Sequence, residues 1–409
     1  IGATLSPPTL GAAAFIIAEY LDIEYVDVLF MAAIPTVLYY VGCWLMVEGD
    51  ARRLGVKPVK TSEESLWGLT IGKGYHFISL AAIAVLLATG MSAFLAVFWS
   101  IVIAVALSMI RSEDRLLAPL AAGVAIAAAI AAYVLGARLS VSAFFGLAAG
   151  GLATFGLHAL QIDRDAAARR LVETLIDGGK GCVGIAATCA TAGIIVSIIN
   201  LTGLGLKLSG LIVDLGGGNL GFTLLLAAFA MWILGTAVPV TASYIIAAVV
   251  LVPALTALDV APHAAHMFMF YYAVLADVSP PTALAPFAAS AICGGSPFAT
   301  MMQAWKYTLP AFVVPFIFCL PPIGTGLLLE GSPHDIVLIT LTASAALAGF
   351  SLGAVGWMIG PLTTLERIAA AAAGVALVIP DIRSQISGAL VLLATGAFQI
   401  WKYRRSGSS

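Results

Sequence analysis

The sequence has few charged residues and almost no net charge. Only 10% of its 409 residues are Asp, Glu, Lys or Arg, the net charge is −2, and 61% are hydrophobic. The mean hydropathy is +1.06. Soluble domains carry roughly 25% charged residues, so this composition excludes an ordinary soluble domain, and no basic surface suggests nucleic acid binding. The chain is predicted to be an all-α polytopic membrane protein.

The motifs of enzymes and metalloproteins are also missing. The five cysteines lie in apolar segments without CxxC spacing, so we interpret them as small core residues. No P-loop, nucleophile elbow or metalloprotease helix occurs, which argues against ATP as energy source and against catalysis. His263 and His266 have i, i+3 spacing without a nearby carboxylate or cysteine, so a surface position at a helix start is expected. We expect no enzyme, no cofactor and no metal other than a coupling ion.

One tetrapeptide, Ser-Pro-Pro-Thr, occurs twice within apolar surroundings, at Ser6–Thr9 and at Ser279–Thr282. Proline removes a backbone donor and pushes the preceding residue out of the helical region, so each copy predicts a broken helix. Free backbone groups at bilayer depth are tolerated only where they are buried in protein or line a cavity. Two such breaks in two halves of a chain predict the binding site of a transporter.

The basic stretches 49–60, 111–115 and 163–170 fall on one side of the membrane if the apolar segments between them are spans. The positive-inside rule makes that side cytoplasmic. Residues 207–219 are predicted to be a glycine-rich loop on the other side. The predicted full spans lie near 28–47, 75–91, 93–110, 116–136, 140–160, 181–203, 307–328, 336–358, 367–380 and 385–401.

Two apolar segments, 220–234 and 242–257, flank a polar centre from Gly235 to Ser243. Neither segment reaches the roughly 20 residues that a span needs, so we predict a re-entrant hairpin whose tip lies in the middle of the membrane. The segment 263–293 then crosses as a helix that is broken at Ser279.

The two breaks are predicted to be related by an inverted repeat. The half-helix after Ser6 leads away from the cytoplasm and the one after Ser279 leads toward it, because the basic loops fix the direction of the next span. Pro35 follows Ser6 by 29 residues and Pro310 follows Ser279 by 31, within apolar spans. Substrate and coupling ions are expected at the interface of such repeats. No hairpin precedes Ser6, so we expect an N-terminally incomplete chain.

The expected organisation has five parts. They are the remainder of the first repeat (1–47), a cytoplasmic basic loop (48–74), scaffold spans (75–170), the second repeat with its hairpin 220–257 and broken helix 263–293 (171–330), and C-terminal spans with a cytoplasmic tail (331–409).

Carbonyls and hydroxyls at the breaks and at the hairpin tip can replace the water around a sodium ion, and helix N-termini can hold a carboxylate. The predicted cation-binding residues are Ser6, Pro7, Gly235, Thr236, Pro239, Thr241, Asp277, Ser279 and Pro280. The predicted substrate-binding residues are Thr9, Ser243 and Thr282. Asp277, the carboxylate of this zone, could ligate a cation or carry a proton. Alternatively, the hydroxyls only satisfy backbone groups freed by proline, and Asp277 is a neutral carboxyl that caps a broken helix.

The segments Ser6–Glu19, Gly235–Tyr244 and Leu275–Leu284 resemble the large membrane subunit of tripartite ATP-independent periplasmic (TRAP) transporters. The resemblance covers most of the chain and is greatest to the fused permeases that partner solute-binding proteins of the TAXI type. The order and spacing of these three segments together are more specific than any single motif.

The resemblance implies an elevator transporter in the bacterial inner membrane. A mobile domain of two hairpins and two broken helices would carry an organic acid and sodium past a static scaffold. It implies a periplasmic solute-binding protein of the TAXI type and a small four-helix membrane subunit, fused or separate, as partners. The family's sodium-site positions fall on the Ser6 break, the Gly235 to Thr241 tip and the Ser279 break; proton coupling is the other option.

Two alternative functions stay open at this point. The chain could be a stand-alone sodium/carboxylate elevator symporter that needs no binding protein. It could also be a non-transporting scaffold subunit whose broken helices are purely structural.

Overall fold

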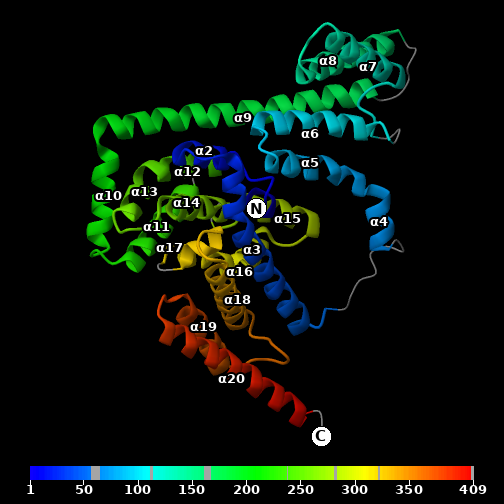
Figure 1. Cartoon of the computed structure of the whole chain (residues 1–409). Coiled ribbons are helices and arrows are strands. Elements are labelled where there is room, and N and C mark those ends of the chain that lie inside the picture. Colours follow the sequence, from blue (N-terminus) through cyan, green and yellow to red (C-terminus); the bar gives the residue numbers. More distant parts are fainter. Residues whose placement is uncertain are drawn as a thin grey trace. The chain divides into compact units, whose positions relative to one another are not determined.

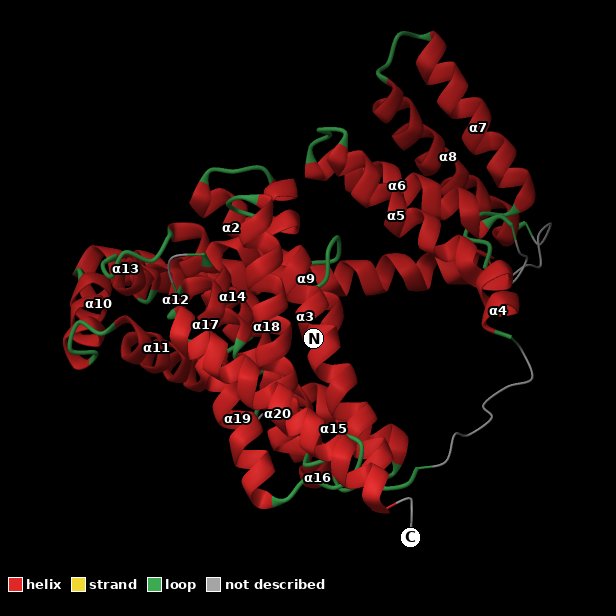
Figure 2. Cartoon of the chain, turned by 60° about the horizontal axis from the view of Figure 1, so that its bottom comes forward, coloured by secondary structure: helices red, strands yellow, loops and turns green. Residues whose placement is uncertain are grey.

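The structure is a computed structural model, which describes residues 1–56, 65–110, 114–160, 167–236, 238–280, 283–320 and 323–406. Within these ranges the chain forms helices joined by turns, with one isolated β-bridge between Trp357 and Pro361 (Figure 2). The all-α prediction is therefore confirmed. The chain divides into two compact units: unit 1 comprises Ile1–Pro58 and Thr188–Ser409, and unit 2 comprises Val59–Ala187.

Unit 2 contains the predicted scaffold spans. Its elements are α4 (Leu66–Lys73), η1 (Gly74–His76), α5 (Phe77–Ala88), α6 (Ala93–Ser108), α7 (Pro119–Val134), α8 (Leu139–Ala159) and the first part of α9 (Ala167–Thr202). Helices α7 and α8 pack closely because α8 presents glycine to its neighbour. A Cβ atom on Gly146 would lie 2.7 Å from the Ala125 carbonyl oxygen, and one on Gly150 would lie 2.7 Å from Ala125 Cβ. Small residues at four-residue spacing are typical of helix pairs in membranes.

Unit 1 begins with three helices, α1 (Gly2–Leu5), α2 (Ala13–Leu21) and α3 (Tyr25–Arg53). The interval between α1 and α2 contains the first Ser-Pro-Pro-Thr motif. Glu24 and Asp27 form a capping box at the start of α3, and the helix ends with two arginines, which suits its dipole. Pro35 lies inside α3 without ending it.

The second half of unit 1 surrounds one helix that is buried along most of its length. Its elements are α10 (Leu204–Leu215), α11 (Leu220–Gly235), α12 (Val240–Val250), α13 (Val252–Thr256), α14 (Pro262–Ala276), α15 (Leu284–Cys293), α16 (Pro297–Thr308), η2 (Leu309–Phe312), α17 (Val314–Cys319) and η3 (Gly324–Leu328). Every residue of α14 from Ala264 to Ala276 is buried. It contacts α2, α11, α12, α13 and α17, among which it lies in Figure 1. A helix that is apolar on all sides is expected to be enclosed in this way.

Three helices complete unit 1: α18 (Pro333–Val355), α19 (Thr364–Val378) and α20 (Ile382–Ser406). Each pairs with the next, and α18 also packs on α3. Ser332 caps α18 and Thr363 forms a capping box with Glu366 at the start of α19. These caps explain why the helices begin where the sequence prediction placed them, within a few residues.

Two sequence predictions are wrong. Residues 207–215 belong to helix α10, not to a loop, and only the glycine turn after Leu215 is irregular. The predicted span 307–328 is divided into α16, η2, α17 and η3. Pro310 and Pro315 lie at the starts of η2 and α17, where each removes a backbone donor and interrupts a continuous helix.

Five of the described helices, namely α3, α8, α9, α18 and α20, are long and apolar enough to cross a membrane. The shorter apolar helices α5, α6, α7, α11 and α12 accompany them. These lengths agree with a multi-pass membrane protein.

Candidate functional site

The first break is a compact turn whose side chains bond to nearby backbone. The Ser6 hydroxyl donates to the Gly2 carbonyl at 2.5 Å and lies 3.1 Å from the Tyr40 hydroxyl on α3. Thr9 Oγ1 donates to the Ala3 carbonyl at 2.8 Å. Thr36 of α3 donates to the Leu5 carbonyl at 2.6 Å, so α3 binds the end of α1 just before the break. Ser6 and Pro7 are half-buried, whereas Thr9 is exposed.

The second break separates α14 from α15. Helix α14 ends at Ala276 with Asp277 as its C-terminal cap, and the Ser279 hydroxyl, fully buried, donates to the Leu275 carbonyl at 2.9 Å. Ala283 has φ +33° immediately before α15. Pro280 is half-buried, and Thr282 lies outside the described residues.

The hairpin tip touches the second break. Gly235 ends α11, and a Cβ atom at this position would overlap Ala276 Cβ at the last turn of α14. The missing side chain is therefore what lets the tip approach the residue beside Asp277. Thr241 lies half-buried in the first turn of α12, and Pro239 is exposed at its N-cap.

The hydroxyls of the hairpin tip donate to nearby backbone carbonyls, as the hydroxyls at the breaks do. Thr236 donates to the Ile233 carbonyl at 2.7 Å, and Ser243, fully buried, donates to the Val238 carbonyl at 3.0 Å. Each predicted hydroxyl with a described hydrogen bond thus satisfies local backbone, as the structural alternative expects. A hydroxyl that donates its proton still has lone pairs on its oxygen, so this bonding leaves it able to ligate a cation.

Asp277 differs from these hydroxyls. Its carboxylate is half-buried and has no hydrogen-bond or ion-pair partner among the described residues. A carboxylate with no partner among the described residues is a candidate ligand for a cation.

Helix α14 connects the two breaks. Tyr271, fully buried on α14, faces Thr36, the residue that bonds to the end of α1. Ala276, which contacts the hairpin tip, follows Tyr271 by five residues, about 7.5 Å along a helix. The first break, the second break and the hairpin tip, which carry the predicted cation-binding residues, therefore all lie near α14. The described contacts do not include a direct one between Ser6 and Ser279.

One histidine prediction is wrong. His266 is only 6% exposed: its Nδ1 lies 2.7 Å from the Tyr244 hydroxyl of α12, and its ring stacks on Tyr20 of α2 at 5.6 Å. It thus links α14 to α12 and α2 inside unit 1 and is not a surface residue. His263 does lie near the surface, where its Nε2 pairs with Glu330 at 2.7 Å.

A buried carboxylate escaped the sequence analysis. Asp50, 3% exposed near the end of α3, accepts hydrogen bonds from Lys306 at 2.7 Å and from Gln303 at 2.8 Å. Both partners lie on α16, so the cluster ties α3 to the segment after the second break. Asp50 stood within a basic stretch, and nothing local in the sequence marks it as buried.

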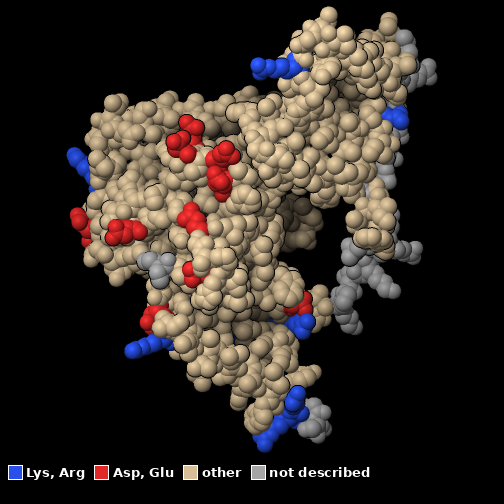
Figure 3. Space-filling view, viewed as in Figure 1, with Lys and Arg blue, Asp and Glu red and all other residues tan. Residues whose placement is uncertain are grey.

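Charged side chains are distributed unevenly over unit 1. In Figure 3 acidic side chains gather around α2, while the end of α20 carries Lys and Arg.

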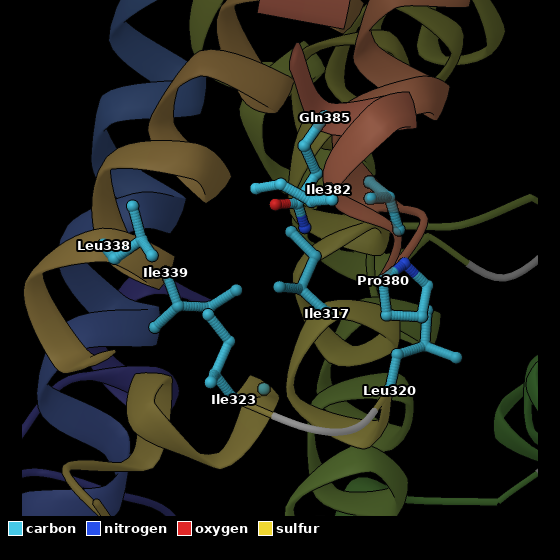
Figure 4. A pocket seen from close by; sticks show the side chains of 10 residues that line it. Ile317, Leu320, Ile323, Leu338, Ile339, Pro380, Ile382 and Gln385 are labelled. Carbon is cyan, nitrogen blue, oxygen red and sulfur yellow. The ribbon is translucent and has the colours of Figure 1, made fainter. Parts of the chain in front are cut away.

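A cavity of about 250 Å³ lies between the α17–η3 region and the turn from α19 to α20 (Figure 4). Its lining is apolar except for Gln385, and it includes no predicted site residue.

Comparison with known proteins gives one finding. No curated protein and no solved structure matches the chain. Residues 1–322, more than three quarters of the sequence, match the family described as tripartite ATP-independent periplasmic transporter, DctM component. The match contains both breaks and the hairpin and ends before α18. The chain therefore belongs to the DctM family, the large membrane components of TRAP transporters.

Proposed function

We propose that the chain is the permease subunit of a secondary-active importer that takes organic acids from a periplasmic solute-binding protein and is driven by a cation gradient, with sodium as the coupling ion. Membership of the TRAP family supports transport without ATP. One observation carries the coupling: the hairpin tip packs through Gly235 on the last turn of α14, beside Asp277, whose carboxylate has no partner among the described residues.

A sodium ion at this point would meet oxygen ligands. Asp277 supplies a negative charge, and the hydroxyl oxygens of Ser279 and Thr236 keep lone pairs after donating to carbonyls. An ionisable residue within the membrane costs at least about 2.5 to 3.5 kcal/mol, so a bound cation would compensate the charge of a carboxylate that has no partner among the described residues. A proton on Asp277 is the competing occupant.

An organic acid would be bound by the helix starts that follow the breaks. Neither α2 nor α15 has a side-chain cap at its N-terminus. The Ala14 amide in the first turn of α2 already donates to the Gly11 carbonyl, so the positive ends of the two helix dipoles, more than free amides, are proposed to favour a carboxylate. Thr9 and Ser243 are proposed to contact the substrate, as is Thr282.

The proposal includes the partners and the motion expected from the family resemblance. A binding protein of the TAXI type would deliver the substrate on the periplasmic side of the inner membrane, and a small four-helix subunit would complete the scaffold. The hairpin and broken helices would move together in an elevator-like cycle.

Sodium binding by the purified full chain tests the coupling site. We expect the Tm in detergent to rise with added NaCl, at constant ionic strength set by choline chloride, because an ion that binds only the folded state stabilises it. Asp277→Asn and Ser279→Ala should each raise the sodium concentration that gives half the shift by about tenfold or more, since each removes a ligand.

Ser290→Ala is the matched control. Ser290 is a buried serine on α15 that donates to the Phe287 carbonyl at 2.7 Å, the same kind of local bond as that of Ser279. Its replacement should leave the sodium response unchanged. A sodium response in Asp277→Asn equal to that of the wild type would contradict the site, and a Tm shift driven by pH in place of sodium would assign the coupling to protons. Uptake in proteoliposomes without any binding protein would instead favour the stand-alone symporter.

A further inference from the structure

The C-terminal helices α18, α19 and α20 lie beyond residues 1–322, the part of the chain that matches the DctM family. In the proposed cycle the hairpin and the broken helices form a moving body, and the family match does not assign the three C-terminal helices to that body or to the scaffold. Their packing inside unit 1 bears on this question. Helix α18 packs on α3 of the first repeat and on η2 and η3 of the second (Figure 1).

Helices α3 and α18 approach closely where both helices end. A Cβ atom on Gly49 of α3 would lie 2.8 Å from Cγ1 and 3.4 Å from Cβ of Val355, the last residue of α18. Arg53 Nη1 of α3 donates to the Val355 carbonyl at 2.9 Å, a group that the end of a helix leaves free. Since the backbone of α3 rests directly on the Val355 side chain, α18 cannot slide along α3 without losing this contact.

The other end of α18 is held by the second repeat. A Cβ atom on Gly326 of η3 would lie 3.0 Å from Ile339 Cγ2 and 3.3 Å from Ile336 Cα, both in the first two turns of α18. Helix α18 is therefore attached at its start to η3 and at its end to α3.

Helices α19 and α20 are fixed to α18 in turn. A Cβ atom on Gly349 of α18 would lie 2.8 Å from the Ala370 carbonyl oxygen of α19. The amide of Gln399 on α20 is buried and donates to Glu366 Oε1 of α19 at 2.6 Å. The three helices thus form one bundle, which we call the C-terminal bundle, and α18 attaches it to both repeats.

Helix α3 is bound to the broken helices. Thr36 of α3 donates to the Leu5 carbonyl just before the first break at 2.6 Å, and Asp50 accepts from Lys306 on α16 at 2.7 Å. Both bonds would break if the broken helices moved past α3. We propose that the C-terminal bundle belongs to the moving body and is carried by α3 together with the broken helices. This inference rests on the elevator-like cycle of the proposed function.

Distances between pairs of spin labels test this proposal. The labels are attached in a cysteine-free background at three exposed positions: Phe229→Cys on hairpin helix α11, Leu393→Cys on α20 and Tyr133→Cys on α7 of unit 2. Double electron–electron resonance of the full chain in nanodiscs is recorded in NaCl and in choline chloride. The distance between residues 229 and 393 should be the same in both salts. The distances from residue 133 to residues 229 and 393 should both shift by more than the width of the 229–393 distribution.

The three pairs separate failure of this inference from failure of the proposed cycle. A constant 393–133 distance with a changing 229–133 distance would overturn the inference and assign the C-terminal bundle to the scaffold. A constant 229–133 distance would contradict the movement in the proposed function and the travelling bundle with it. The Tm of each labelled variant shows whether it is folded.

A disulfide between α3 and α18 gives an independent check. The Cβ positions of residues 49 and 355 are 3.4 Å apart, close to the roughly 3.5–4.5 Å that a disulfide spans. Gly49→Cys/Val355→Cys should therefore form a disulfide in membranes to the same extent in NaCl and in choline chloride. Gly49→Cys/Leu338→Cys is the control and should form none, because Leu338 lies near the opposite end of α18. A 49–355 disulfide that forms in only one salt would overturn the proposal, since α18 would then separate from α3.

Discussion

Gly235 shows how a single missing side chain shapes the candidate site. It ends α11 at the point where the hairpin tip reaches Ala276, and any Cβ atom there would overlap that residue. The tip can therefore sit beside Asp277 only because residue 235 is glycine. Gly210, on α10, has nothing within 4 Å of its own Cβ position, which makes it a natural comparison.

The same substitution should have opposite effects at these two glycines. Gly235→Ala should lower the free energy of unfolding by about 1–3 kcal/mol through overpacking against Ala276. Gly210→Ala should raise it by about 0.5–1 kcal/mol, because glycine inside a helix is entropically unfavourable. Thermal unfolding of both variants in the same detergent checks this. A Gly235→Ala protein as stable as the wild type would show that the tip does not contact α14.

The sequence predicted the positions of individual site residues better than it predicted which distant residues they contact. The double prolines predicted where Ser6 and Ser279 lie, because proline acts on its own neighbourhood. The surroundings of His266 depend on Tyr20 and Tyr244, which are distant in sequence, so its burial could not be predicted from the spacing of histidines. Asp50 was missed for the same reason: its partners are on α16.

At the scale of elements, α3 and α16 are joined by one buried ion pair. Asp50 is 4% exposed in its side chain and Lys306 is 24% exposed, with 2.7 Å between Oδ2 and Nζ. Removing one partner of such a pair leaves the other charge buried without compensation, which is destabilising. Removing both partners leaves no buried charge, so this penalty disappears.

A double-mutant cycle should reveal this coupling. Asp50→Asn and Lys306→Met should each lower the free energy of unfolding by about 1–3 kcal/mol, and the double variant should lower it by clearly less than the sum. Denaturation in mild detergent provides the measurement. The exposed pair Arg169–Glu173, at 3.0 Å, is the control and should show a coupling below about 1 kcal/mol. Additive effects at Asp50 and Lys306 would contradict a linkage between the two helices.

The two wrong element predictions have different physical causes. Helix α10 carries Lys207, Asp214 and two glycines, which resemble a loop composition, but α10 packs against α11, α12 and α13. Tertiary contacts therefore stabilise a helix that propensity alone disfavours. The span 307–328 looked continuous because hydropathy is insensitive to backbone geometry, while its prolines divide it.

At the scale of the whole molecule, the basic segments predict a direction for the chain in the membrane. Cysteines introduced by Leu54→Cys and Arg404→Cys should react with a membrane-impermeant maleimide only from the cytoplasmic side, and those from Glu19→Cys and Lys207→Cys only from outside. Spheroplasts and inverted vesicles provide the two sides. The background chain has its five cysteines replaced by alanine, since all five are free thiols. Labelling of Glu19→Cys and Leu54→Cys from the same side would refute the predicted orientation of α3.

The enclosure of α14 has a mechanical consequence. A helix whose residues Ala264 to Ala276 are all buried has almost no surface that lipid or water can contact along that length, so it cannot slide past its neighbours without opening a void around bulky rings such as Phe268 and Tyr271. In the proposed elevator-like cycle, the hairpin and α14 would therefore move together as one rigid body, and contacts would be exchanged only at the outer surface of that body.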